Sequence, residues 1–321
     1  MTRVLTISGL LSLGLSACSA AQAPIQSDPH TPLTAYPGYT GTYPDFALAI
    51  DERFDHFDET LWHKGDGAVG GESICRFQPQ GVQVEDGVMK LVIRREEIAP
   101  GWSEDHQQEK GDYPFSCGEV RTQPEVNIHY GRLEARMKAP NRETASGYIS
   151  SLFTYRFAED PGSSLPDAVE WEEIDVELEG GRPDKFQANL IYGKDTWEWW
   201  RTRAYGAWED KIVVGPVDEW RVFAIEWMPD AIRWYVDGEL VKTLSASDID
   251  CDPDCIPPQE NPTPIPNNPT AVFMNFWIPV DAIQNDFGGN KERNAYPMTA
   301  EYDWFRYYEW TANPAEPTGS D

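Results

Sequence analysis

The run that decides how this chain folds is Glu173-Ile174-Asp175-Val176-Glu177, in which acidic and β-branched apolar residues alternate. Because side chains alternate across a β-strand, Glu173, Asp175 and Glu177 share one face, while Ile174 and Val176 enter the core. Three carboxylates on one face repel one another and raise at least one pKa, as a general acid near neutral pH requires. The run therefore predicts a catalytic strand, and a solvated strand face is the alternative.

The two outer acids suit a retaining glycosidase. That reaction needs a nucleophilic carboxylate and an acid/base carboxylate roughly 5 Å apart. On a flat strand the Cα atoms of Glu173 and Glu177 would lie about 13 Å apart, at about 3.3 Å per residue. Both side chains must therefore lean inward over Asp175.

Composition points to one large domain with many aromatic side chains. The chain has 321 residues, 40% of them hydrophobic, with 13 Trp, 14 Tyr and 13 Phe, which is enough for a single catalytic domain of about 250 residues. Aromatic rings either stack on sugar rings or fill a β-sandwich core. The net charge of −28 argues against nucleic acid and favours a neutral polymer as substrate, although Arg121, Arg201 and Arg203 offer a local positive patch for an anionic one.

The first residues have the pattern of a targeting segment. A basic start and an apolar stretch from Val4 to Leu15 lead into Leu15-Ser16-Ala17-Cys18, which resembles a bacterial lipoprotein signal. The resemblance implies cleavage before Cys18, lipidation of that residue and delivery to the outer membrane; ordinary secretion with cleavage near residue 23 is the alternative. We expect a signal peptide over 1–17, a flexible tether over 18–44, a catalytic domain over 45–312 and a disordered tail over 313–321.

Four further cysteines predict two disulfides in the oxidising compartment that such a signal implies. Four cysteines allow three pairings. Cys251 and Cys255 close a tight loop on their own, which leaves Cys75 with Cys117. A structural zinc site is the weaker alternative, because there is no second close cysteine pair and the five His are scattered.

The remaining pattern predicts an all-β fold. Short alternating segments occur at 87–94, 131–138, 148–155, 222–227 and 232–236, and Asp237-Gly238 then predicts a hairpin turn into 239–242. No long amphipathic helix is evident, and 156–169 and 251–270 have the composition of loops. Many antiparallel strands over this length predict a two-sheet β-jelly-roll sandwich.

The chain resembles glycoside hydrolase family 16, and within it the bacterial lichenases. The resemblance is carried by Trp171–Leu178 and by further segments in the same order, which together span roughly residues 50 to 310. These segments are Cys117-Gly118-Glu119-Val120-Arg121, Tyr130–Lys138, Ser150–Tyr155, Trp234–Gly238, Met274-Asn275-Phe276-Trp277 and Ala300–Trp304.

The resemblance implies a concanavalin A-like jelly roll with a concave cleft that cuts a polysaccharide internally with retention. Glu173 matches the nucleophile, Glu177 the acid/base, and Asp175 the carboxylate that tunes both. The other residues that match cleft positions are Trp171, Glu119, Arg121, Asn189, Asn275 and Trp277.

The same resemblance implies two stabilising features and no catalytic cofactor. Cys75 and Cys117 match the lichenase disulfide. Gly87 and Asp303 match positions that help to hold a structural calcium on the convex side. An Asp beside aromatic residues at a strand end can equally cap a turn.

Departures from the lichenase pattern concern the substrate. Val69 and Ile191 stand where lichenases have Asn and Tyr, the loop between Tyr155 and Trp171 is longer, and Trp197-Glu198-Trp199-Trp200 adds an aromatic cluster.

Mixed-linkage β-1,3-1,4-glucan is the expected substrate. A cell-wall transglycosylase, a depolymerase of succinoglycan-type exopolysaccharide and a glycan-binding lipoprotein are the alternatives. We expect a monomer that touches the membrane only through a lipid anchor.

Overall fold

The computed structural model describes residues 33–67, 73–98, 101–103, 108–110, 113–157, 171–193, 207–245, 247, 265–281 and 288–311. Several positions singled out in the sequence lie outside these ranges. They are Cys18, Val69, residues 197–201, Arg203, Cys251 and Cys255.

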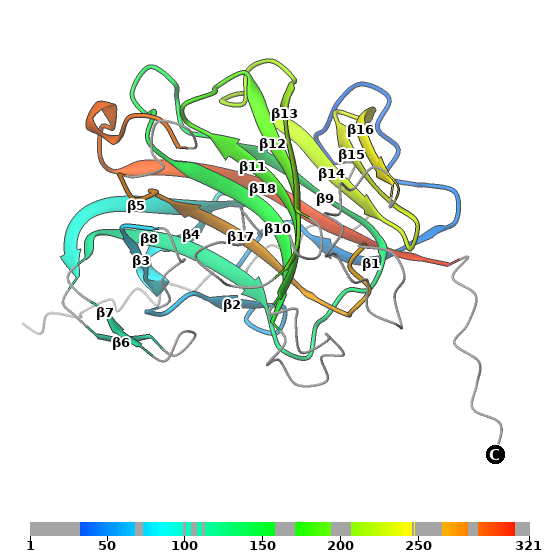
Figure 1. Cartoon of the computed structure of the whole chain (residues 1–321), viewed down its shortest axis with the longest axis horizontal. Helices are drawn as coiled ribbons and strands as arrows, with labels where there is room; N and C mark the ends of the chain where they lie inside the picture. The colour runs from blue at the N-terminus through cyan, green and yellow to red at the C-terminus, as the bar shows by residue number, and fades with distance from the viewer. Residues whose placement is uncertain are drawn as a thin grey trace, which may run out of the picture.

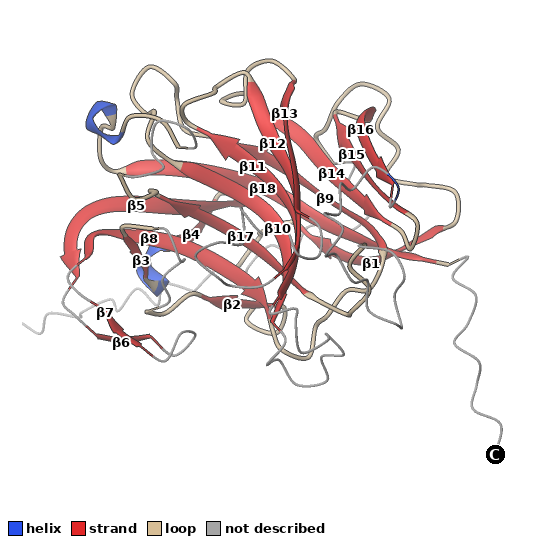
Figure 2. Ribbon diagram, viewed as in Figure 1, coloured by secondary structure: helices blue, strands red, loops and turns tan. Residues whose placement is uncertain are grey.

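The described chain is built almost entirely of β-strands, arranged as two sheets (Figures 1 and 2). The front sheet has the order β13-β12-β11-β10-β17-β8 and the back sheet the order β5-β18-β9-β14-β15-β16, and pairing of β5 with β8 joins them. The predicted jelly-roll sandwich is confirmed. The front strands are β13 (Ala207–Val213), β12 (Lys185–Gly193), β11 (Trp171–Glu179), β10 (Ile149–Phe157), β17 (Ala271–Trp277) and β8 (Tyr113–Thr122).

The back sheet and the smaller elements complete the sandwich. The back strands are β5 (Val88–Ile98), β18 (Met298–Trp310), β9 (Gly131–Lys138), β14 (Arg221–Trp227), β15 (Ala231–Val236) and β16 (Glu239–Ser245). Short strands pair at the margins: β1 (Phe46–Glu52) with β18, β2 (Trp62–Lys64) and β3 (Cys75–Phe77) with β8, β4 (Val82–Glu85) with β5, and β6 (Gly101–Ser103) with β7 (Gln108–Lys110). The 3-10 turns are η1 (Pro79–Gly81) and η3 (Lys291–Arg293).

The alternating segments of the sequence all form strands at the predicted places. The Asp237-Gly238 turn between β15 and β16 has φ of 49° and 83°, so both residues adopt the left-handed conformation that a two-residue hairpin requires. Among the described residues, no helix is long and apolar enough to cross a membrane.

The core lies between the two sheets and receives the apolar half of β11. Ile174, Val176 and Leu178 are almost fully buried, and burying each such side chain contributes roughly 1.5–3 kcal/mol. Trp234 of the back sheet crosses the core and donates its indole N–H to the backbone carbonyl of Asp175 at 2.9 Å. The core therefore positions the acidic strand directly.

The disulfide between Cys75 and Cys117 is present, with the two Cα atoms 5.7 Å apart. It joins β3 to β8, which pair in parallel with Phe77 opposite Cys117. The predicted pairing is confirmed for this bridge.

The structure differs from the expected tether over residues 33–44, which pack on the back sheet. Tyr39 and Tyr43 both donate their hydroxyls to the buried carboxylate of Glu134, Tyr43 at 2.7 Å. The Arg132 guanidinium lies 4.1 Å from the centre of the Tyr43 ring, a cation–π contact. Pro, Thr and Gly make this stretch resemble a linker, but its tyrosines give it enough apolar surface and enough donors to bind.

Candidate active site

One face of β11 carries a column of carboxylates that points away from the core. Strand alternation puts Trp171, Glu173, Asp175 and Glu177 on this outer face, and the column continues to Glu179. Because β11 lies between β10 and β12, Glu173, Asp175 and Glu177 each have a register partner on both sides. These neighbours form registered rows across the front sheet, whose strands are labelled in Figure 1.

The Glu177 row is polar across five strands. Gln187 of β12, Ser151 of β10, Asn275 of β17 and Glu119 of β8 occupy successive register positions beside Glu177. The Gln187 amide donates to Glu177 Oε2 at 2.8 Å, and the Asn275 amide donates to Glu119 Oε2 at 3.4 Å. The row therefore surrounds the Glu177 carboxyl group with side chains that form hydrogen bonds.

The Asp175 row combines one amide with aromatic rings. Asn189 of β12 lies opposite Asp175 and hydrogen-bonds its carboxyl group. On the other side lie Phe153 and Phe273, which stack with ring centres 5.0 Å apart, and then Arg121. The row places the central acid between a hydrogen-bond donor and an apolar wall.

The Glu173 row is the most apolar of the three. Ile191 and Tyr155 flank Glu173 on β12 and β10. The Trp171 indole donates to Glu173 Oε2 at 3.0 Å, and the Trp171 and Tyr155 rings lie nearly parallel, 15° apart, with centres at 6.5 Å. Glu173 is the most accessible of the three acids, because Asp175 and Glu177 are buried.

Burial and mutual repulsion shift the pKa of all three carboxyl groups upward. Burial raises the pKa of Glu173 to about 7, against the opposing effect of hydrogen bonds from Asp175 and Trp171. Burial, followed by the charges of Glu173 and Glu177, raises the pKa of Asp175 well above its usual range. Burial, followed by the charges of Glu173 and Glu179, does the same to the pKa of Glu177. The groups titrate as a set rather than singly.

Three buried acceptors on these rows have no hydrogen-bond partner among the described residues. They are Asp175 Oδ1, Gln187 Oε1 and Asn275 Oδ1. A buried polar atom without a partner costs about 1–3 kcal/mol, so such atoms mark places where a ligand or water donates. All three accept hydrogen bonds, which suits a ligand rich in hydroxyl groups.

The residues predicted from the sequence thus come together on one face. Trp171, Glu119, Arg121, Asn189 and Asn275 lie in the three rows or at their end, and Trp277 lies one row further along, opposite Ile149. Several residues of the face were not predicted. They are Ser151, Phe153, Tyr155, Glu179, Gln187 and Phe273; alternation within β11 could have found Glu179, whereas the others depend on strand pairing that the sequence does not show.

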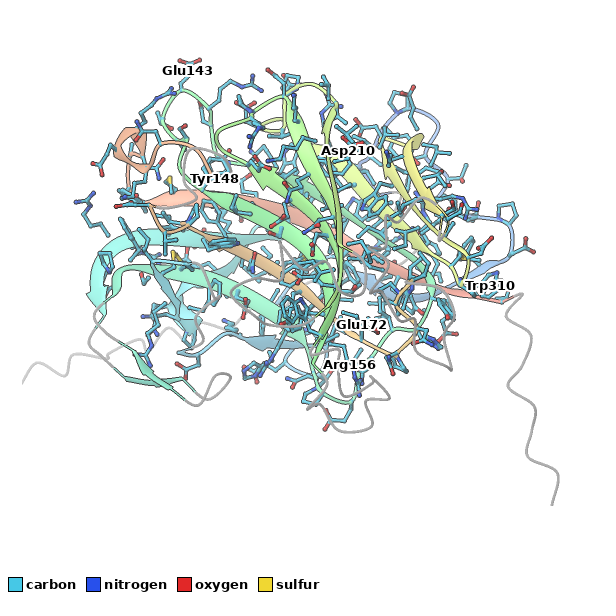
Figure 3. All side chains as sticks on the ribbon, in the orientation of Figure 1. Glu143, Tyr148, Arg156, Glu172, Asp210 and Trp310 are labelled. Atoms are coloured by element: carbon cyan, nitrogen blue, oxygen red, sulfur yellow. A yellow bond between two sulfur atoms is a disulfide. The ribbon has the colours of Figure 1, made fainter. Side chains whose placement is uncertain are left out.

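Glu172 was also missed, and it lies on the inner face of the same strand. Its carboxylate accepts hydrogen bonds from the backbone N–H of Asn268 at 2.9 Å and from the Asn268 amide at 3.3 Å. Arg156 is its register partner on β10, and the two labelled side chains lie at the same end of the strands (Figure 3). Burial raises the pKa of Glu172 to about 7, against the opposing effect of the Asn268 hydrogen bonds.

The described residues at the predicted calcium site do not form a set of calcium ligands. Gly87 belongs to the Asp86-Gly87 turn between β4 and β5, and Asp303 lies on β18. Asp303 Oδ2 accepts an ion pair from Arg136 at 2.6 Å, so a guanidinium already neutralises the one carboxylate nominated. Among the described residues, no group of three His, Cys, Asp or Glu side chains could hold a metal. Calcium at Gly87 and Asp303 stays a prediction.

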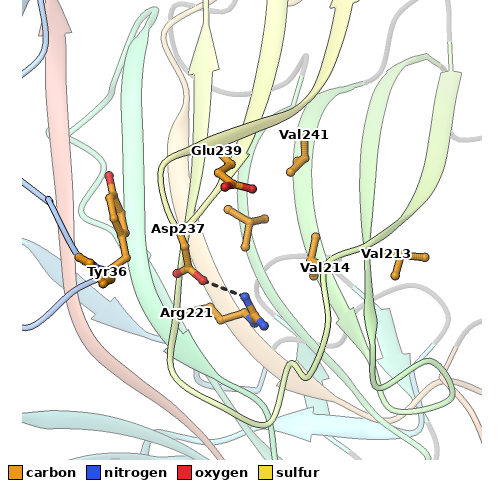
Figure 4. Close-up of a pocket in the computed structure, with 9 residues that line it drawn as sticks. Tyr36, Val213, Val214, Arg221, Asp237, Glu239 and Val241 are labelled. Carbon is orange, nitrogen blue, oxygen red and sulfur yellow. Dashed lines mark hydrogen bonds and ion pairs between the residues drawn. The ribbon is translucent and has the colours of Figure 1, made fainter.

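A separate cavity of about 540 Å³ lies at the edge where β13 meets β16 (Figure 4). Tyr36, Val214 and Val241 line it, together with the ion pair between Arg221 and Asp237 at 2.8 Å. None of the residues of the three rows lines this cavity. This cavity is therefore separate from the acidic column of β11.

The family assignment follows from comparison of the whole chain. The sequence profile of "Glycosyl hydrolases family 16" matches residues 71–305, which include β3 to β17 and all but the last residues of β18 and leave out β1 and β2. This chain belongs to glycosyl hydrolase family 16. Its acidic column on β11 is therefore the candidate active site of a glycosyl hydrolase.

Two relatives of this chain share the name "Beta-glucanase". This chain is 29% identical over 262 residues to the "Beta-glucanase" of Paenibacillus polymyxa, covering 80% of this chain and 86% of that protein. It is 28% identical to a "Beta-glucanase" of Bacillus subtilis, covering 80% and 84%.

Solved structures agree on the fold. A lichenase from a mouse hindgut metagenome superposes with a TM-score of 0.56 at 25% identity, over 82% of this chain and 99% of the other. The β-glucanase of Bacillus licheniformis gives a TM-score of 0.56 at 25% identity, over 81% and 97%.

Proposed function

We propose that this family 16 protein is an endo-acting, retaining β-glucanase, and that its substrate is mixed-linkage β-1,3-1,4-glucan. The observation that carries the proposal is the acidic column Glu173-Asp175-Glu177, whose members share one outer face and differ in their surroundings. β-Glucanase relatives that cover four-fifths of the chain support the substrate class.

Glu173 is the proposed nucleophile because it is the least buried of the three acids and accepts hydrogen bonds from two donors. Two donors stabilise its negative charge, the Trp171 indole N–H and the protonated carboxyl of Asp175. Its oxygen attacks the anomeric carbon and forms a glycosyl-enzyme bond while the bond to the leaving oxygen breaks. Asp175 contributes by donating to Glu173 in the resting state.

Glu177 is the proposed acid/base because its surroundings keep it protonated. Burial and the neighbouring carboxylates favour its neutral form, and the Gln187 amide holds one oxygen in place at 2.8 Å. Glu177 gives its proton to the leaving glycosidic oxygen. It then removes a proton from the water that releases the sugar from Glu173, which restores both acids.

The outer face supplies binding groups for a neutral glucan. The near-parallel Trp171 and Tyr155 rings and the stacked Phe153 and Phe273 rings form an apolar wall beside the acids, on which a sugar ring can stack. The three unpartnered acceptors would receive hydrogen bonds from sugar hydroxyls. Ile191, buried beside Glu173, adds apolar surface instead of a hydroxyl.

Three other functions are compatible with the same face. A transglycosylase would transfer the sugar from Glu173 to another sugar instead of water. A depolymerase of succinoglycan-type exopolysaccharide would use the same acids on an anionic chain. A glycan-binding lipoprotein would need an inactive site, which the presence of all three carboxylates disfavours.

The test is release of reducing ends from barley β-glucan, lichenan, laminarin, xyloglucan, agarose and succinoglycan, with sized products. Barley β-glucan and lichenan should be cut, and NMR of fresh products should show the β-anomer first. Glu173→Gln should lower turnover by at least about 10³-fold while glucan binding persists. Turnover that survives this change would remove the assigned nucleophile, and lengthened oligosaccharides without new reducing ends would favour transglycosylation.

We also propose that Cys18 carries a lipid anchor that holds the enzyme at the outer membrane. The motif Leu15-Ser16-Ala17-Cys18 supports this. Metabolic labelling with a fatty acid should mark the wild-type protein and not Cys18→Ser, which should move to the soluble fraction. Soluble wild-type protein without label would favour ordinary secretion.

A further inference from the structure

Glu179 is the one carboxylate of the acidic column that the mechanism above does not use. It follows Glu177 by two residues on β11, so its side chain shares the outer face with the acid/base. Glu179 is 1% exposed, which is unusual for an acidic side chain on a sheet face. A buried carboxylate in this position needs a physical reason.

Two cations from different parts of the chain hold Glu179. Arg182 forms an ion pair with Glu179 Oε2 from the turn that follows β11, where its backbone N–H bonds the Glu179 carbonyl at 3.0 Å. Lys211 Nζ of β13 lies 3.5 Å from Glu179 Oε1. Both cation side chains are more than 20% exposed, whereas the carboxylate between them is buried.

Lys211 also belongs to the Glu177 row. It is the register partner of Gln187 on β13, and Gln187 is both the register partner and the hydrogen-bond donor of Glu177. Glu179 therefore adds a negative charge beside the acid/base and pairs with the cation of its row, Lys211. The charge of Glu179 and its capture of Lys211 act on Glu177 in the same direction.

We propose that Glu179, held by Arg182 and Lys211, is a positioning residue that keeps Glu177 protonated for its role as acid. The proposal rests on the assignment of Glu177 as acid/base made above. Among the described residues, the charged groups on the strands beside Glu177 are Glu173, Asp175 and Glu179 on β11, Lys185 on β12, Lys211 on β13 and Glu119 on β8, with Arg182 in the turn after β11. Strands β10 and β17 contribute the uncharged Ser151 and Asn275.

The pKa directions agree with this geometry. After burial and the charge of Glu173, the charge of Glu179 raises the pKa of Glu177, and the charge of Lys211 lowers it. Removal of Glu179 removes a repulsive charge and leaves two cations uncompensated. Removal of Lys211 does the opposite, so the two substitutions should act in opposite directions.

The experiment compares four variants of the purified protein. Glu179→Gln removes the charge with little change of shape, Glu179→Asp keeps it, and Lys211→Met removes the cation. Lys242→Met is the matched control. Lys242 of β16 forms an ion pair at 3.0 Å with Asp210, which precedes Lys211 on β13. Because side chains alternate along β13, Asp210 faces away from the Glu177 row. Two readouts are used: the ¹³C titration of the Glu177 carboxyl, assigned with Glu177→Gln, and the pH profile of kcat/KM on barley β-glucan.

Glu179→Gln should move the Glu177 titration and the basic limb of kcat/KM to lower pH by about one unit, and Lys211→Met should move both to higher pH. Glu179→Asp and Lys242→Met should stay close to the wild type. Two results with a folded Glu179→Gln variant would overturn the proposal and leave a purely structural role. One is a Glu177 titration at the wild-type pH; the other is a lower kcat with the basic limb of kcat/KM at the wild-type pH.

If Glu179→Gln does not fold, the same two readouts on Lys211→Met decide. Absence of glucan hydrolysis by the wild type would reject the proposed substrate, while the NMR titration would still test Glu179.

Discussion

At the scale of the residue, Glu172 and Glu173 show how one step along a strand changes the function of a glutamate. Glu173 faces outward and accepts from Trp171. Glu172 faces inward, where it holds the segment that leads into β17 through Asn268. The two carboxyl groups have similarly raised pKa values, about 7 in each case, but only Glu173 lies on the face proposed to bind substrate.

The inward position of Glu172 predicts a pH-dependent contribution to stability. Because burial raises its pKa from 4.5 to about 7, the folded state retains a proton that the unfolded state loses between these values. Its contribution is therefore complete below pH 4.5 and is lost as pH rises to 7. Glu172→Gln removes this titration, so its stability relative to wild type should rise by up to about 3 kcal/mol between pH 5 and pH 8.

Urea unfolding at pH 5, 6, 7 and 8 measures this difference. Glu143→Gln is the control, because Glu143, labelled in Figure 3, is exposed and its substitution removes a carboxyl group from the surface instead of from the core. A Glu172→Gln difference that stays constant across the four pH values would contradict the prediction.

At the scale of the element, β8 connects stability to the site. The strand carries Cys117 in the disulfide and Glu119 two residues later in the Glu177 row. The bridge closes a separation of 42 residues, for which chain entropy predicts about 3–4 kcal/mol. The double substitution Cys75→Ala/Cys117→Ala should therefore lower the free energy of unfolding by about this amount.

Denaturant unfolding of the double variant tests the estimate, and wild-type protein held in reductant should show the same loss. The kcat/KM of the folded variant should fall only modestly, because β8 still pairs with β5 and β17. An unchanged unfolding midpoint would show that the bridge adds no stability.

The N-terminal segment is the second element whose packing carries a prediction. Tyr39 and Tyr43 supply two of the hydrogen bonds to Glu134, which has 0% exposure. Tyr39→Phe/Tyr43→Phe should lower the free energy of unfolding by roughly 1–3 kcal/mol, because a buried carboxylate loses donors. Residues before Phe46 should also be cleaved sooner in limited proteolysis.

The control in the same segment is Thr40→Ala, since Thr40 is exposed and its side chain bonds Thr42, its neighbour in the same segment. If the double tyrosine variant unfolds and is cleaved like Thr40→Ala, the segment does not depend on Glu134 for its attachment.

At the scale of the whole molecule, the back sheet positions the chemistry of the front sheet. The Trp234 indole reaches through the core to the Asp175 carbonyl. Trp234→Phe should cost roughly 2–3 kcal/mol of stability through lost volume and a lost hydrogen bond. It should also lower kcat/KM roughly ten-fold, because the acidic strand loses a support behind its central residue.

Trp304→Phe is the matched control. Trp304 is equally buried, and its indole donates to the Thr34 carbonyl at 2.9 Å, far in the chain from β11. It should lose similar stability with little change in kcat/KM. Equal losses of kcat/KM in the two variants would show that Trp234 acts only through general stability.

The sequence by itself determined the all-β class, the strands and the acidic face of β11, because strand alternation is a local property of the backbone. Pairing of Cys75 with Cys117 followed from counting cysteines and from the resemblance to lichenases. Local patterns also misassigned residues 33–44 to a tether, because their attachment depends on Glu134 and Trp304, which come much later in the chain.

Only the tertiary structure decided which residues surround the acids. Register between strands distant in sequence brings Gln187, Ser151 and Asn275 beside Glu177, and it sets Lys211 beside Glu179. Burial is likewise a property of the assembled sandwich, and it is the largest cause of the raised pKa values. The chain therefore encodes the acids locally, while their ionisation depends on neighbours that only folding brings together.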